Sequence, residues 1–458
     1  MIVLVGQAMA SMDEEILVIA APSLRQDLHA SSADLQLVLV MYTIAFAALV
    51  VIGAQLGDVV GRRRAFLFGL AGFTLASLVG GLAPNPAVLV GARAVQGASA
   101  AVMTPQVLSI IQFQFEGEER ARAIGAYSMV LAVGVAVGEI VGGLLVSSQL
   151  LTAAWRPALL LNAPIGAVLL PVAFHRLPDV GRVARHRLDL SGALLLSAAL
   201  VGLVVPLLFG RDTGWPAWTW PCMLACAVVF VGFVARERQL AGRGQDPLFD
   251  LGVLGRPGVA AGVVAVLVLM ACYAGFLVCL TLYLQSGLHF SALAAGVIFA
   301  AYAAGFAVAS LTWTHLRVAV RDRLPAVGSL AMGVGMLGVG VAAAGGEWPI
   351  ALTTPLLVCA GAGHACAFSP LATRLTTVVN VTQAADVSGL IITASLVGQV
   401  LGVAVFVDVY FAALAYGWAR ALAVTTVALA AALVPTAMCA GKASRIAASI
   451  PHTDLRPA

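Results

Sequence analysis

The sequence predicts an all-α polytopic membrane protein. Of its 458 residues, 61% are hydrophobic and only 10% are charged, whereas a soluble domain carries about 25% charged residues. The mean hydropathy is +1.01. The apolar residues lie in segments long enough to cross a bilayer as helices, and none alternates with period two as the strands of a membrane barrel do. Little of the chain remains for a soluble domain.

Polar breaks divide the apolar residues into segments of spanning length. At roughly 20 residues per spanning helix plus short loops, a chain of this length holds about fourteen spans. The predicted helices are 2–24, 34–57, 65–83, 86–114, 122–147, 156–175, 188–210, 217–236, 258–285, 291–315, 323–344, 348–372, 384–412 and 417–440.

The orientation follows from the basic residues. With an even number of spans, most Lys and Arg residues fall in loops on one side, which the positive-inside rule assigns to the cytoplasm. Both termini are therefore expected to be cytoplasmic. The longest cytoplasmic connections flank the seventh and eighth helices, which predicts a plan of six, two and six. The expected parts are a six-helix bundle, an inserted pair with its linkers, a second six-helix bundle and a cytoplasmic tail, at 1–176, 177–256, 257–441 and 442–458.

Composition excludes several function classes. The net charge is +4 and the basic residues are scattered, so we expect no nucleic-acid partner. The single lysine, Lys442, is not part of a phosphate-binding loop, so any active transport must draw on an ion gradient or on a separate subunit, and no bound cofactor is expected. The seven cysteines lie in apolar segments without metal-ligand spacing. No nucleophile–base spacing predicts an enzyme or a catalytic residue.

A charged loop follows the second predicted helix, in the segment 54–64. It contains Asp58, the turn glycine Gly61 and the arginines Arg62 and Arg63. Arginine is costly in lipid, so the loop marks the cytoplasmic surface. We expect these residues to govern conformational switching at the cytoplasmic mouth. The alternative is a solvated basic loop that serves topology alone.

Charged side chains also lie inside predicted spans. Asp13, Glu14 and Glu15 are in the first, where a carboxylate is suited to binding a proton or a cationic substrate. The three acids follow at steps of about 100° around a helix, so they cannot all face one narrow cavity. Arg93 is midway along the fourth helix and should face a wet cavity or a carboxylate. Arg93 has either a functional role in such a cavity or a structural one, as a fixed ion pair between helices.

The fifth predicted helix contains Gly134, Gly138 and Gly142 at every fourth residue, a flat face that lets another helix approach closely. Glu139 borders this face, either as a second protonatable site or as a structural hydrogen-bonding group. His364 is the only histidine well inside a span. It contacts substrate, or it is simply hydrogen-bonded in the interior.

Several short sequence strings, which contain most of the residues named above and are given at the end of this paragraph, resemble motifs of one protein family. Together they resemble the fourteen-helix drug/proton antiporter branch of the major facilitator superfamily. Asp13 and Pro22 match its acidic first-helix motif, and Arg93 matches its basic fourth-helix motif. Departures are Ala54 and Val59 in the loop, and Glu139 where the helix-five motif has proline. The matching strings are AQLGDVVGRRR, MDEEILVIAAP, GARAVQGASAA, GVAVGEIVGG and WRPALLLNAPIG, with weaker matches at YLQ (283–285) and GQVLGVA (398–404).

The resemblance implies a major facilitator fold and a proton-coupled antiporter that exports amphipathic, cationic drugs or antibiotics by alternating access. It implies proton coupling by Asp13, Glu139 and Arg93. Substrate contacts are expected at Asp13, Glu14, Glu15, Glu139 and His364. The protein is expected to be a monomer in the cell membrane, such as a bacterial inner membrane, with protons, lipid and a small molecule as partners. The alternatives are a dedicated exporter of one endogenous metabolite or antibiotic, and a non-transporting membrane sensor.

Overall fold

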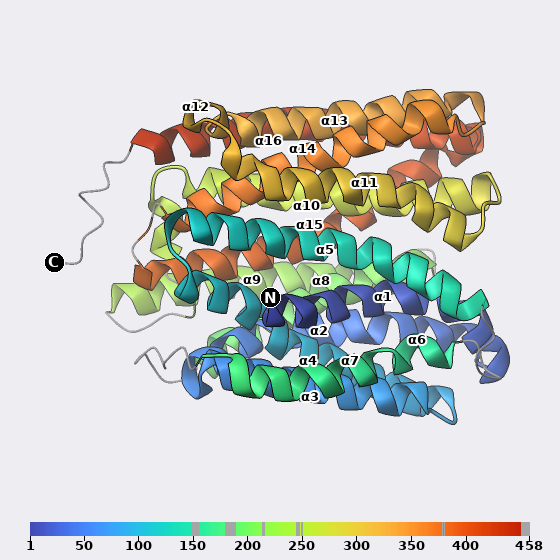
Figure 1. Ribbon diagram of the computed structural model, residues 1–458, viewed down its shortest axis with the longest axis horizontal. Coiled ribbons are helices and arrows are strands. Elements are labelled where there is room, and N and C mark those ends of the chain that lie inside the picture. Colours follow the sequence, from blue (N-terminus) through green and yellow to red (C-terminus); the bar gives the residue numbers. More distant parts are fainter. Residues whose placement is uncertain are drawn as a thin grey trace. The chain divides into compact units, whose positions relative to one another are not determined.

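The computed structural model is helical in the residues that it describes (Figure 1). The chain divides into two compact units. Unit 1 comprises Met1–Gln114 and Gly134–Leu248, and unit 2 comprises Phe115–Val133 and Phe249–Ala458. The described residues are 1–147, 155–178, 189–212, 216–243, 248, 251–377, 379 and 381–449.

The helix α5 (Gly117–Ser147) begins in unit 2 and ends in unit 1. The other helices of unit 1 are α1 (Ile2–Asp27), α2 (Ser32–Val60), α3 (Arg62–Gly81), α4 (Pro86–Gln114), α6 (Arg156–Leu160), α7 (Asn162–Arg176), α8 (Leu190–Asp212) and α9 (Thr219–Gly242).

Unit 2 contains the remaining helices, with short turns between several of them. Its helices are α10 (Val259–Leu282), α11 (Ala292–Thr312), α12 (Val318–Arg321), α13 (Leu324–Ala342), α14 (Ile350–Thr377), α15 (Val381–Ala413) and α16 (Trp418–Ser449). Its 3-10 turns are Leu251–Gly255, Trp313–His315, Ala343–Gly345 and Leu414–Tyr416, and Tyr283–Gly287 is a π turn.

Local chemistry sets several helix boundaries. α2 begins with a capping box, in which the Ser31 hydroxyl accepts from the Asp34 amide and the Asp34 carboxylate accepts from the Ser31 amide. These bonds from Ser31 hold the pKa of Asp34 below its ordinary value. α11 begins at a Ser291 hydroxyl that accepts from the Ala294 amide at 3.1 Å. Gly61 separates α2 from α3 with a φ of +95°, a conformation that glycine adopts without strain.

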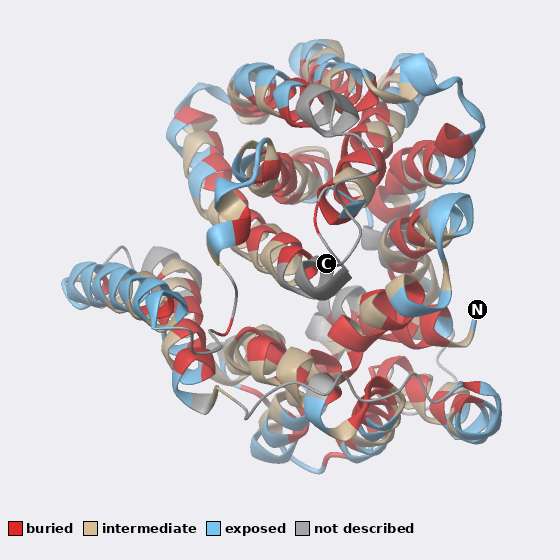
Figure 2. Cartoon of the chain, turned by 90° about the vertical axis from the view of Figure 1, so that its left-hand side faces the viewer, coloured by how far each residue is buried: buried red, intermediate tan, exposed pale blue. Residues whose placement is uncertain are grey.

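Eleven helical segments among the described residues are long and apolar enough to cross a membrane. α6 and α7 together form one of them, Arg156–Arg176. Figure 2 shows helices with buried residues on one side and exposed residues on the other. Large apolar side chains are among the exposed ones, such as Phe68 and Met438. Such a surface suits contact with lipid.

Both units share one packing arrangement. α4 packs mainly against α2 and α3, and α14 packs mainly against α11 and α13. The helices approach closely at glycines: a Cβ added at Gly97 would lie 2.3 Å from the Tyr42 carbonyl oxygen, and one at Gly361 would lie 2.0 Å from the Tyr302 carbonyl oxygen. The recurrence of this arrangement in the two units is the pattern of an internal structural repeat.

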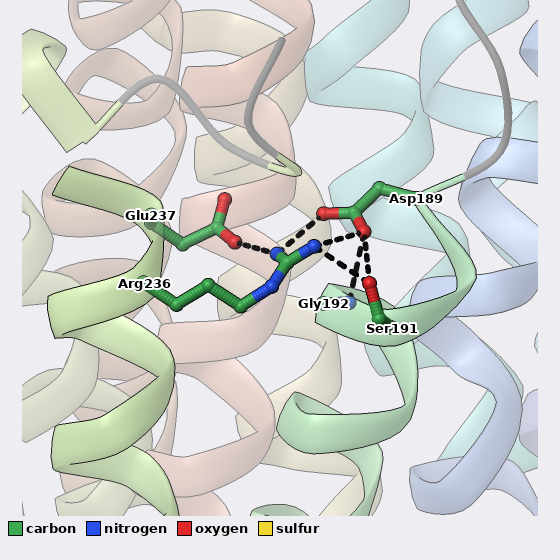
Figure 3. Close-up of polar contacts among 5 residues, drawn as sticks. All are labelled: Asp189, Ser191, Gly192, Arg236 and Glu237. Atoms are coloured by element: carbon green, nitrogen blue, oxygen red, sulfur yellow. Dashed lines mark hydrogen bonds and ion pairs between the residues drawn. The ribbon is translucent and has the colours of Figure 1, made fainter. Parts of the chain in front are cut away.

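α8 and α9 pack against each other, and α8 also packs on α2. A charged cluster joins the beginning of α8 to α9 (Figure 3). The Arg236 guanidinium donates to both oxygens of Asp189, at 2.7 and 2.8 Å, and to Glu237 at 2.7 Å. Burial alone would raise the pKa of Asp189, but hydrogen bonds from Arg236, Gly192 and Ser191 outweigh it, so this pKa lies below its ordinary value.

Candidate functional site

Asp13 of α1 and Arg93 of α4 form a buried ion pair. The Arg93 Nη1 donates to the Asp13 Oδ2 at 2.5 Å, and the two side chains are 1% and 0% exposed. An uncompensated charge at this depth would strongly destabilise the fold, and each of the two residues supplies the opposite charge that the other requires. Of the two surroundings expected for Arg93, a wet cavity or a carboxylate, the structure shows the carboxylate. Its role in proton coupling stays a prediction.

Amide side chains bind the other oxygen of Asp13. The Gln96 Nε2 donates to the Asp13 Oδ1 at 2.7 Å, and the Asn162 Nδ2 donates to the same oxygen at 2.6 Å. Gln96 also accepts from Arg93 at 2.8 Å and donates to the Ser77 hydroxyl at 2.8 Å. We call Asp13, Ser77, Arg93, Gln96 and Asn162 the polar cluster. They come from α1, α3, α4 and α7, and all are buried.

The polar cluster fits an ionised carboxylate. Three side chains donate N–H groups to Asp13, and the Arg93 guanidinium balances its charge. The Tyr42 ring of α2 lies 4.5 Å from the guanidinium, a cation–π contact. A proton on Asp13 would remove the charge that these donors face, so proton uptake would weaken the links from α1 to α4 and α7.

The glycines of α5 contact the helix that carries Asp13. A Cβ added at Gly134 would lie 2.8 Å from the Ser11 Cβ, and one at Gly142 would lie 3.1 Å from the Ile16 Cα. Gly138 is buried. The close approach predicted for this face is therefore present, whereas the switching role of these glycines stays a prediction.

The arginines after Gly61 contact neighbouring helices of unit 1. Arg62 is buried, with its guanidinium 3.7 Å from the centre of the Phe113 ring of α4. Arg63 donates to the Phe174 carbonyl oxygen of α7 and lies 5.4 Å from the centre of its ring. These contacts tie the loop to α4 and α7. Its role in switching stays a prediction.

His364 of α14 lies in an aromatic cluster of unit 2. Its Nδ1 is 2.8 Å from the Tyr302 hydroxyl of α11. The rings of Tyr273 and Phe306 lie 5.0 and 4.8 Å from the imidazole, centre to centre, and Phe368 is also in contact. The imidazole is thus hydrogen-bonded in the interior, as one of the two sequence interpretations held. Its contact with substrate stays a prediction.

The side chains of Glu14, Glu15, Asp58 and Glu139 lie outside the described part of the structure, and their roles stay predictions. The sequence did single out Asp13 and Arg93. It missed four residues that complete their surroundings: Tyr42, Ser77, Gln96 and Asn162. Gln96 and Asn162 are in the strings that resemble the antiporter branch, which is the signal that marks them. Tyr42 and Ser77 carried no comparable signal.

Comparison with known proteins identifies the family. The family model described as Major Facilitator Superfamily matches residues 3–403. The "Probable actinorhodin transporter" of Streptomyces coelicolor is 40% identical over 63% of this chain, and the chain spans 50% of that relative's length. The "Cephamycin export protein CmcT" of Amycolatopsis lactamdurans is 35% identical over 87% of this chain and 81% of that protein.

The fold also resembles solved structures. The "human organic anion transporter MFSD10 (TETRAN)" has a TM-score of 0.67 over 96% of this chain and 98% of that chain, at 16% sequence identity. An identity this low supports the fold alone. The family match covers most of the chain, and it confirms the prediction of a multi-pass membrane transporter. The chain therefore belongs to the Major Facilitator Superfamily.

Proposed function

We propose that this protein is a proton-coupled antiporter that exports amphipathic, cationic drugs or antibiotics by alternating access. The polar cluster carries this proposal, because it holds a carboxylate away from water with a charge that a proton would cancel. Asp13 binds either a proton or the cationic group of the cargo, and Arg93 compensates its charge between those states. The energy source is the proton gradient, without a bound cofactor.

The relatives support the choice of cargo. Two of them are named for the transport or export of an antibiotic, actinorhodin and cephamycin. Because each name refers to a single compound, a dedicated exporter of one endogenous metabolite is the second candidate. The two differ in breadth: a multidrug exporter transports many members of a panel of compounds, and a dedicated exporter transports one.

The coupling has a definite energetic scale. One pH unit across the membrane supplies about 1.4 kcal/mol per proton, and each net charge moved through 100 mV supplies about 2.3 kcal/mol. One proton exchanged for one monovalent cation moves no net charge, so it uses the pH difference alone. A second proton could bind at Glu14, Glu15 or Glu139. Exchange of two protons for one monovalent cation moves one net charge, so the membrane potential then adds to the driving force. His364 is proposed as a further substrate contact.

We also propose fourteen spans in the plan of six, two and six. The support comes from α1, α5 and α8, with 26, 31 and 23 residues, which lie outside the eleven segments but are long enough to cross a bilayer. The distribution of Lys and Arg supports cytoplasmic termini. The predicted boundaries at residues 176, 256 and 441 remain part of this proposal, as do the switching roles of the loop 58–63 and the α5 glycines.

The test uses purified protein in liposomes with an imposed pH gradient and cationic, neutral and anionic dyes. We expect the wild type to accumulate cationic dye against its concentration gradient. Asp13→Asn keeps the side-chain volume but removes the charge, and should lower uphill accumulation by about tenfold or more, the effect of roughly 1.4 kcal/mol. Glu347→Gln makes the same chemical change at an exposed position and serves as the matched control.

Two outcomes would overturn the proposal. The first is a wild type that moves dye down its gradient but shows no accumulation when the pH gradient is imposed. The second is an Asp13→Asn variant that accumulates dye as well as the wild type does. Substrate breadth is measured with the same liposomes and a panel of antibiotics, which decides between the multidrug and the dedicated exporter.

A further inference from the structure

We propose that Asn162 is a positioning residue that changes its hydrogen bonding with the protonation state of Asp13. Its carboxamide donates to the ionised carboxylate, and after a half-turn it accepts from the protonated acid. The inference rests on the proposed function, because it supplies the step that links proton binding at Asp13 to movement of α7.

The first observation is an orphaned atom. The Asn162 Nδ2 donates to Asp13, but its Oδ1 has no hydrogen-bond partner among the described residues, although Asn162 is 0% exposed. Leaving a buried polar atom unsatisfied costs about 1–3 kcal/mol. Buried groups of this kind call for an explanation, and a second hydrogen-bonded state of the same side chain provides one.

Gln96 provides the contrast. Its Oε1 accepts from Arg93, and its Nε2 donates to both Asp13 and Ser77. A half-turn of this carboxamide would break these bonds and set its carbonyl oxygen against the carboxylate. Gln96 is therefore fixed. Within the described part of the chain, a half-turn of Asn162 breaks only its bond to Asp13, because its Oδ1 makes no hydrogen bond there.

The proposed step consists of proton binding and a side-chain rotation, and it keeps one hydrogen bond between Asp13 and Asn162. A proton from water binds to the Asp13 Oδ1 and forms an O–H bond, which at first opposes the Asn162 N–H group. Rotation of the Asn162 carboxamide about its Cβ–Cγ bond exchanges Nδ2 for Oδ1, and the new O–H donates to this oxygen. One hydrogen bond joins the two residues before and after. Release of the proton reverses the rotation.

The surroundings of Asp13 leave this role to Asn162. Arg93 faces the Asp13 carboxylate from α4, and the neutral Gln96 and Asn162 face it from α4 and α7. α3 contributes the Ser77 hydroxyl through Gln96, and α2 contributes the Tyr42 ring against Arg93. Arg93 and the fixed N–H group of Gln96 match only the ionised carboxylate, whereas the Asn162 carboxamide matches both forms of the acid by turning.

The position of Asn162 explains how the change reaches the rest of the helix. Asn162 is the first residue of α7, and the helix is interrupted at Leu161. Pro164 has no N–H group to donate to the carbonyl oxygen four residues before it, which weakens this turn. Beyond the interruption, Trp155 and Arg156 bind Asp27 of α1, at 3.0 and 3.4 Å. The same span therefore contacts two carboxylates of α1, with a weakened turn between the contacts.

The test separates coupling from binding. Asn162→Leu preserves the shape of the side chain without a donor or acceptor, and Asn162→Asp retains acceptors but has no N–H group. Each variant is assayed for uphill accumulation across a range of pH, and for exchange of labelled dye at equal concentrations without a gradient. We expect uphill accumulation to fall about tenfold in both variants, since a hydrogen bond to a charged group contributes about 1.5–3 kcal/mol. Exchange should change by less than about threefold.

Ser77→Ala is the matched control. It removes a buried hydrogen bond of the polar cluster without touching Asp13, so it should lower accumulation and exchange together and leave the pH profile of accumulation unchanged. The Asn162 variants should alter that profile. Thermal unfolding in detergent identifies any variant that does not fold, and the other Asn162 variant then decides the question.

The measurements distinguish a failure of the Asn162 inference from a failure of the proposed function. Wild-type accumulation with an unchanged pH profile in a folded Asn162→Leu or Asn162→Asp variant would overturn the inference and leave the proposed function standing. Parallel loss of accumulation and exchange with an unchanged pH profile would also overturn it, because that pattern belongs to a structural role. A wild type without proton coupling contradicts the proposed function itself.

Discussion

The two units place different chemistry in the same packing arrangement. In unit 1, Gly97 of α4 lies against the backbone of Tyr42. In unit 2, Gly361 of α14 lies against the backbone of Tyr302. Each tyrosine also contacts a basic side chain of the neighbouring helix: the Tyr42 ring lies against the Arg93 guanidinium, and the Tyr302 hydroxyl bonds to His364.

The difference lies in charge. The Arg93 guanidinium is a positive charge, so its burial requires Asp13 and the amides around it. His364 sits among aromatic rings, where an uncharged imidazole needs only hydrogen bonds. The comparison teaches that the same helix packing arrangement accommodates either a charge-balanced cluster, as in unit 1, or a neutral aromatic cluster, as in unit 2. Gain or loss of a proton should disturb the first far more than the second.

The largest effect is expected from Arg93→Met, which leaves the Asp13 carboxylate buried without its counter-charge. Breaking a buried pair in this way costs about 3–5 kcal/mol. We expect this loss in the free energy of unfolding, measured by denaturation in detergent. The double variant Asp13→Asn with Arg93→Met removes both charges and should regain much of the stability. Equal losses in the single and double variants would contradict the idea that charge balance stabilises this cluster.

A smaller effect is expected in unit 2. His364→Phe leaves the Tyr302 hydroxyl buried without its partner, which costs about 1–3 kcal/mol. Adding Tyr302→Phe removes the unsatisfied hydroxyl, so the double variant should be more stable than the sum of the two single variants implies. The pH profile of uphill transport should keep its wild-type midpoint. A shifted midpoint would show that His364 carries a proton and would remove the contrast between the units.

The sequence was sufficient for the elements and for the charged centre of the site. Long apolar segments predict spanning helices, and charge at membrane depth singled out Arg93 and Asp13. That the two form a pair is shown only by the structure. The neutral partners were harder to find. Ser77 and Tyr42 are common residues in a membrane helix, and only the packing of α3 and α2 against α4 shows that they face the pair.

Asn162 illustrates the same limit. Its position in a string of the antiporter branch marked it, but its function depends on atoms that a sequence does not place. Its Nδ2 donates to a carboxylate from another helix, while its Oδ1 accepts no hydrogen bond from any residue that the structure describes. His364 shows the limit from the other side. The sequence left substrate contact and interior hydrogen bonding both open; the structure shows the bond to Tyr302 and the surrounding rings, and contact with substrate stays a prediction.

The smallest effect is expected where an ion pair is only partly buried. Arg236 and Asp189 have side chains that are 26% and 13% exposed, so Asp189→Asn should cost only about 1 kcal/mol, near the upper end for exposed pairs. The folded-state pKa of Asp189 is lowered from the ordinary 3.8. Its contribution to stability is thus complete well above pH 3.8 and is lost as the pH falls through the lower folded-state value.

The free energy of unfolding of wild type and Asp189→Asn, measured from neutral to acid pH, checks this sign. The difference between them should shrink in acid. Dye transport should differ by less than about twofold, because the pair joins the beginning of α8 to the C-terminal part of α9, outside the polar cluster. A difference that stays constant into acid would show that the charge of Asp189 contributes nothing. If Asp189→Asn lowered the free energy of unfolding as much as Arg93→Met does, burial would not be what distinguishes the two ion pairs.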